Sequence, residues 1–164
     1  MASSTGRMQG IVHWGCLAAL TALLILAAVG DMRRYIIPNW LNAVVALLAV
    51  PWWLTMPGAD WAAAGWQLVF AAGVLLLFGL LFARGLMGGG DVKLLVALAL
   101  WLPWAAFLQM FLFIAVLGGL LTAGLLAAHR LRRREGVPEI PYGVAIAAGA
   151  LIVTGEPIVK YLVG

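Results

Sequence analysis

Long runs of apolar residues limit the folds available to this chain more than any other feature of its sequence. The runs are Ile11–Gly30, Ile37–Pro57, Ala62–Ala83, Val92–Ala128 and Pro141–Val159. A membrane-spanning helix needs roughly 20 apolar residues, so each run is a candidate span. Charged residues make up only 10% of the chain, whereas soluble domains are about a quarter charged. The sequence therefore predicts an all-α membrane protein, with residues 1–164 forming a single integral-membrane domain.

The basic residues suggest how often the chain crosses the membrane. Lys and Arg collect in cytoplasmic loops, and eight of the ten lie between the apolar runs. They are Arg33, Arg34, Arg84, Lys93, Arg130, Arg132, Arg133 and Arg134. The basic groups at positions 84–93 and 130–134 can both lie in the cytoplasm only if the chain crosses the membrane outward and back between them. This requires Val92–Leu102 to cross, or nearly cross, the membrane. We therefore predict a six-transmembrane-helix bundle with N and C termini outside and residues 31–36, 84–91 and 129–140 in the cytoplasm.

The tryptophans agree with this topology, because Trp prefers the two interfacial belts of a membrane. Those at the predicted outer ends are Trp14, Trp52, Trp53, Trp61, Trp66, Trp101 and Trp104, while Trp40 falls at an inner end. We therefore expect them to be interfacial anchors.

Several kinds of site are absent from the sequence. It contains no nucleic-acid-binding motif, and its basic residues read as topology signals. The single cysteine, Cys16, excludes an internal disulfide, and there is no CxxC motif or Cys/His cluster for zinc. We expect no metal and no organic cofactor.

Two of the six acidic residues have unusual positions. Asp31 ends the first apolar run and Asp91 begins the fourth, in "LMGGGDVKLL", and the topology places both at the cytoplasmic boundary. Two carboxylates held close cannot both ionise, so a pair shares a proton. One can then take a proton from an attacking water while the other donates to a peptide carbonyl. The pair therefore indicates an aspartic protease.

The residues around Asp91 fit this chemistry. Gly88, Gly89 and Gly90 carry no side chains, so a substrate backbone can approach them closely. Asp91 lies where a helix N-cap is expected, and Lys93 adds a positive charge nearby, which favours Asp91 as the base. Each aspartate taken alone also fits a structural role, Asp91 as a cap and Asp31 as a partner of Arg33 or Arg34.

Three motifs in this chain resemble those of the type IV prepilin peptidases, which are GxGD intramembrane aspartic proteases. They are "GGGDVKLL", "DMRRYIIPN" and "IPYGVAIAAGAL". The resemblance implies removal of the basic leader of type IV prepilins and pseudopilins at the cytoplasmic face of the bacterial inner membrane. It implies that Asp31 and Asp91 are catalytic and that no cofactor takes part. The chain is similar to the short form that serves Flp-type (tight adherence) pili and lacks a cytoplasmic CxxC segment, so we do not predict methylation of the pilin.

Other motif residues are assigned supporting roles. We expect Pro38 and Asn39 to start the second helix and Pro141 to start the sixth, because Pro is favoured in a first helical turn. Tyr142 is expected either near the aspartates or as an interfacial anchor. Glu135 and Glu139 are the residues expected to contact a basic leader, while the arginines at 130–134 bind lipid headgroups.

Two other functions remain open. One is a proton-coupled transporter with Asp31 and Asp91 as relay carboxylates, although transporters place such residues near the midplane and often contain internal repeats. The other is a non-catalytic assembly protein of a pilus machine, which needs neither carboxylate. The pilin substrate and the oligomeric state do not follow from the sequence.

Overall fold

A computed structural model describes residues 4–56, 60–131 and 140–163 of the chain. Within these ranges the protein is all-helical, with six helices and no strand. The helices are α1 (Ser4–Arg34), α2 (Asn39–Thr55), α3 (Trp61–Ala83), α4 (Gly89–Ala99), α5 (Trp104–Leu131) and α6 (Tyr142–Val163). The predicted all-α class is therefore confirmed.

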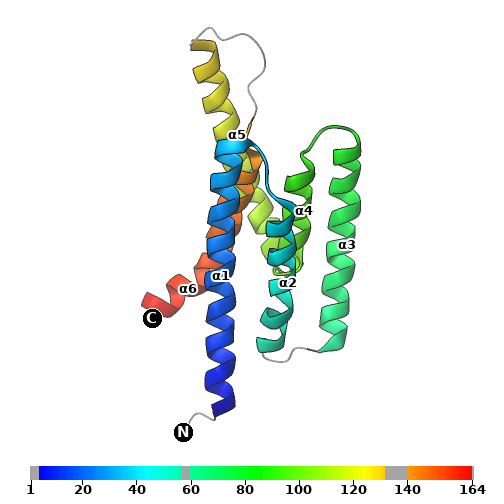
Figure 1. Cartoon of the computed structure of the whole chain (residues 1–164), viewed down its shortest axis with the longest axis vertical. Helices are drawn as coiled ribbons and strands as arrows, with labels where there is room; N and C mark the ends of the chain where they lie inside the picture. Colours follow the sequence, from blue (N-terminus) through cyan, green and yellow to red (C-terminus); the bar gives the residue numbers. More distant parts are fainter. Residues whose placement is uncertain (1–3, 57–59, 132–139, 164) are drawn as a thin grey trace.

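The shortest helix, α4, is at the centre of the arrangement. It packs against α2, α3, α5 and α6, while α1 packs against α2 and α6, and α5 packs along α6. Figure 1 shows α1 beginning and α6 ending at the same end of the bundle, with α3 at one flank. The helices α2, α4 and α6 all begin toward the opposite end, where α1 finishes (Figure 1).

Burial follows this arrangement. A helix that is apolar on all sides is expected in an interior, and α4 buries Leu94, Leu95 and Leu98 almost completely. By contrast, α3 and α5 leave large apolar side chains such as Leu76 and Leu112 more than half exposed. These outer surfaces suit contact with lipid.

In the described part of the chain, three helical segments are long and apolar enough to cross a membrane: Gly6–Arg34, Ala62–Ala83 and Trp104–Leu131. The helix α4 has 11 residues, which at about 1.5 Å per residue is roughly half of the ~30 Å hydrocarbon core. The segment Val92–Leu102 thus does not reach across a membrane as a helix by itself. The six-span count and the outside position of both termini stay predictions.

Side chains from neighbouring helices bind the carbonyl groups at the C-terminal end of α4. The indole N–H of Trp53 donates to the Leu100 carbonyl at 2.7 Å, and the Gln67 amide donates to the carbonyls of Ala99 and Leu102 at 2.5 and 2.6 Å. The last carbonyls of a helix have no partner within the helix, and lipid offers none. These bonds allow α4 to end among apolar side chains.

Two of the tryptophans differ from the expected interfacial anchors. Trp101 is buried, and its indole N–H donates to the Val45 carbonyl at 2.8 Å. Trp53 binds the end of α4. Both therefore join helices within the bundle, because their N–H groups donate to backbone carbonyls of a neighbouring helix or helix end. Trp66 and Trp104 are largely exposed, as an interfacial position requires.

Replacing Gln67 with Leu should destabilise the fold by about 1–3 kcal/mol, because two carbonyl groups at the end of α4 lose their donor. Thermal unfolding of the purified protein in detergent measures this loss. Gln109→Leu, which changes an exposed glutamine of α5, is the matched control and should leave the midpoint unchanged. Equal midpoints for the two variants would contradict this role of Gln67.

Candidate functional site

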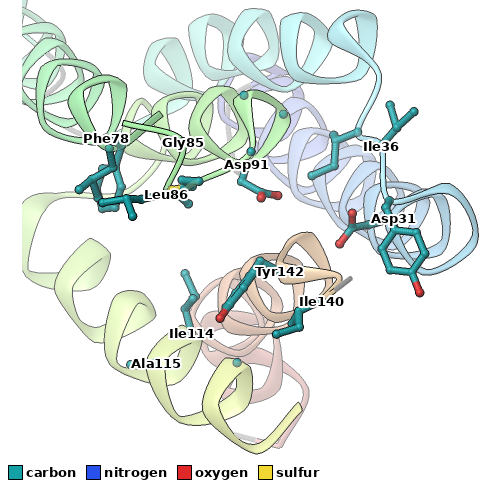
Figure 2. A pocket seen from close by; sticks show the side chains of 18 of the residues that line it. Asp31, Ile36, Phe78, Gly85, Leu86, Asp91, Ile114, Ala115, Ile140 and Tyr142 are labelled. Carbon is teal, nitrogen blue, oxygen red and sulfur yellow. The ribbon is translucent and has the colours of Figure 1, made fainter. Parts of the chain in front are cut away.

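Four helix ends meet around the two aspartates. Asp31 lies in the last turn of α1, and Asp91 lies in the first turn of α4. Figure 2 shows both carboxylates directed toward one space, with Tyr142 of α6 beside it. Residues 60 positions apart in the sequence therefore face a common site.

The carboxylate of Asp31 is held by the beginning of α6. Asp31 is 5% exposed, and its Oδ2 accepts a hydrogen bond from the Val144 backbone N–H at 3.2 Å. The backbone N–H of Gly143 also interacts with this carboxylate. A Cβ atom at position 143 would lie 2.8 Å from Oδ2 of Asp31, which is closer than non-bonded atoms pack. Glycine at this position therefore lets the carboxylate reach the α6 backbone.

Asp91 is not the N-cap that the sequence predicts. The N-cap of α4 is Gly88, so Asp91 is the third residue of the helix. The reason is that the helix begins earlier, within the glycine run, and Gly89 and Gly90 belong to its first turn. Asp91 still lies at the positive end of the helix dipole, which favours a negative charge there.

The turn between α1 and α2 fits between the other two helix starts. Tyr35 directly follows α1 and has a φ of 53°, in the left-handed region where glycine is usual. Ile37, two residues later, is close to both glycines that flank the aspartates. A Cβ at Gly90 would lie 3.2 Å from Cβ of Ile37, and one at Gly143 would lie 2.7 Å from its Cδ1. Ile37 thus packs tightly between α4 and α6.

The two aspartates line a cavity of about 970 Å³. Most of its wall is apolar or glycine, and Phe78 of α3 and Phe111 of α5 line it as well, with ring centroids 5.7 Å apart. The lining also includes Arg34, Tyr35, Ile36, Ile37, Leu86, Met87, Gly88, Gly89, Gly90, Ile114, Gly118, Ile140 and Tyr142. The cavity is therefore large enough for an extended peptide segment and presents two carboxylates to it.

Several predicted supporting residues are at or near the cavity. Gly88, Gly89 and Gly90 line it. Tyr142 also lines it, but its hydroxyl oxygen accepts a hydrogen bond from Thr122 at 3.4 Å. The two expected helix-starting prolines, Pro38 and Pro141, lie directly before α2 and α6.

Other supporting residues have a different environment from the one expected. The Lys93 ammonium, predicted to act near Asp91, donates to the Asn39 side-chain oxygen at 2.7 Å on an exposed surface. The charge therefore links α4 to α2 and does not face the cavity. Glu135 and Glu139, predicted to contact a basic leader, lie outside the described residues.

Sequence reasoning did not identify two residues of this region. Gly143 contacts Asp31, and its place after Pro141 and Tyr142 in the third motif was a usable signal. Asn42 is a buried amide in α2 whose Nδ2 donates to the Gly90 carbonyl at 3.2 Å. Its signal was an amide side chain within an apolar run.

The donor set of the site consists of carboxylates. Within the described ranges, no three His, Cys, Asp or Glu side chains are grouped so that they could hold a metal ion. Two facing carboxylates can share one proton, and such a pair can polarise a water molecule while donating a proton to a carbonyl oxygen.

Comparison with known proteins places this chain in a family. The model of the type IV leader peptidase family matches residues 18–123, a range that includes both aspartates. A prepilin leader peptidase/N-methyltransferase of Burkholderia pseudomallei (strain 1026b) is 37% identical over 149 residues, which cover 87% of this chain and 47% of the relative. Proteins with the same description from Aeromonas hydrophila and Bacillus subtilis (strain 168) are each 30% identical, over 90% and 87% of this chain.

The chain spans about half the length of these relatives: 47%, 53% and 56% of the three proteins. No solved structure matches it significantly. The family model nevertheless covers most of the sequence and the whole region between the two carboxylates. On these grounds the chain belongs to the type IV leader peptidase family.

Proposed function

We propose that this protein is an intramembrane aspartic endopeptidase that removes the basic leader peptide of type IV prepilins. The observation that carries the proposal is the placement of Asp31 and Asp91 on one cavity, at the end of the bundle where α1 finishes and α4 begins. The relatives described as prepilin leader peptidases support the choice of substrate. Pilins of the Flp type are the substrate class that the sequence resemblance favours.

In the proposed mechanism a water molecule binds between the carboxylates. The ionised aspartate takes a proton from this water as the water oxygen attacks the carbon of the scissile carbonyl. The protonated aspartate donates its proton to the carbonyl oxygen. The aspartate that accepted the proton then donates it to the leaving amine. Coupled carboxylates titrate as a pair. We therefore assign the roles of base and acid to the dyad as a whole and not to one particular aspartate each.

We further propose that the protein lies in the bacterial inner membrane as six spans, with both termini outside and the aspartates on the cytoplasmic side. The basic residues near the dyad, Arg33, Arg34 and Arg84, support this orientation. The position of both carboxylates at helix ends supports a peptidase over a proton-coupled transporter, which is expected to place them near the midplane.

The first test concerns the dyad. Asp31→Asn and Asp91→Asn should each abolish leader removal, because an amide keeps the shape of the side chain but cannot exchange the proton. Co-expression with a candidate prepilin, followed by a gel that resolves precursor from product, measures processing. Asp60→Asn changes the aspartate that caps α3 and should leave processing intact. Full processing by either dyad variant, inserted at the normal level, would refute the mechanism.

A second test uses the glycine behind Asp31. Gly143→Ala should slow leader removal at least about tenfold, because the added methyl group displaces the Asp31 carboxylate and a misplacement of about 1 Å can cost about 100-fold. Gly155→Ala is the matched control on the same helix, since a Cβ there meets nothing within 4 Å. Initial rates from purified proteins provide the comparison. Equal rates for the two variants would show that the contact with Asp31 is unimportant.

A third test addresses orientation. In a Cys16→Ser background, Leu86→Cys should be blocked from labelling by an impermeant thiol reagent added to intact cells and should react after the cells are opened. Leu86 suits this test because it is 71% exposed and lines the cavity. Asp60→Cys, at the opposite end of α3, should react from outside. Labelling of position 86 in intact cells would exclude a cytoplasmic dyad.

A further inference from the structure

Asn42 is a buried polar residue whose side chain contacts the helix turn that carries Asp91. It is 4% exposed, and its Nδ2 donates to the carbonyl oxygen of Gly90 at 3.2 Å. Gly90 directly precedes Asp91 in the chain. The other polar atom of the side chain, Oδ1, is buried and has no hydrogen-bond partner among the described residues.

The stability of the fold does not account for this amide. Its neighbours on the buried face of α2, Leu41 and Val45, are apolar and almost fully buried. A buried amide is unfavourable unless its polar atoms are hydrogen-bonded, and here only one of the two atoms has a partner among the described residues. A leucine of similar size would fill this position without that cost. What the amide adds is a directional contact with one backbone carbonyl.

That contact acts on the geometry of the dyad. Two side-chain hydrogen bonds hold the beginning of α4 against α2. Asn42 donates to the Gly90 carbonyl, and Lys93 donates to the Asn39 side-chain oxygen. Ile37 packs against the same turn, and it also packs against Gly143 beside Asp31. Fixing α4 against the beginning of α2 therefore fixes the distance between the two aspartates. Asn42 is not among the residues that line the cavity, so it acts through Gly90.

We propose that Asn42 is a positioning residue of the proposed peptidase: its hydrogen bond to Gly90 sets the place of Asp91 relative to Asp31. This inference rests on the proposed function. Because Asn42 does not line the cavity, its loss should leave substrate binding unchanged and slow the chemical step. Misplacement of a catalytic group by about 1 Å can reduce the rate about 100-fold.

The test measures kcat, KM and the unfolding midpoint of purified Asn42→Leu with a prepilin substrate. We expect kcat to fall about 10- to 100-fold, with KM within about twofold of the wild-type value and a midpoint equal to or above that of the wild type. Gln67→Leu is the matched control, because it removes a side-chain amide that binds backbone carbonyls at the opposite end of α4. It should lower the midpoint and leave kcat unchanged.

The outcomes separate this inference from the proposed function. If the wild-type protein does not cleave any prepilin, the proposed function fails. If the wild type cleaves and Asn42→Leu retains its kcat, or loses activity only in step with its midpoint as a structural residue would, the positioning role is refuted. Asn42→Ser, whose hydroxyl is too short to reach Gly90, repeats the test if the leucine variant does not accumulate. Failure of both variants to accumulate makes Asn42 a folding residue and also refutes the role.

Discussion

The structure depends on the requirement that backbone polar groups surrounded by apolar material find partners within the protein. Helix α4 covers only about half of the hydrocarbon core, so neighbouring side chains must pair the carbonyl groups at its end. Trp53 and Gln67 supply the donors at that end. This allows an 11-residue helix at the centre of the bundle to begin beside the site. A full-length span in its place would need no such bonds.

The same requirement shapes the opposite end of α4. There the starts of three helices and the end of α1 come together, and their unpaired backbone N–H groups favour a carboxylate. The α6 backbone supplies an N–H group to Asp31 through Val144, which also donates to the Pro141 carbonyl. Close approach is possible because Gly90 and Gly143 face Ile37 without side chains. The position of the proposed dyad thus follows from backbone contacts among helix ends, and the cavity in front of it is left for a substrate.

Much of the fold and of the site could be read from the sequence, because the relevant signals are local. Apolar runs of spanning length and prolines before α2 and α6 mark where helices lie and begin. The motifs around Asp31 and Asp91 identify the two carboxylates of the proposed dyad. The position of Asp91 within its helix was misjudged because a glycine run usually indicates a turn, and packing against Ile37 and Phe82 stabilises a helix there instead.

By itself, the sequence determined that this is an all-helical membrane protein of the type IV leader peptidase family, with two carboxylates in matching motifs. Composition and short motifs carry that information. A membrane-spanning helix needs a long run of apolar residues, and each motif consists of residues that are close together in the sequence. Only the tertiary structure decided that Gly143 supports Asp31, that Asn42 holds the turn of Asp91, and that Lys93 binds Asn39. Each of these contacts joins residues at least 48 positions apart, and no local pattern records which side chains meet once helices pack.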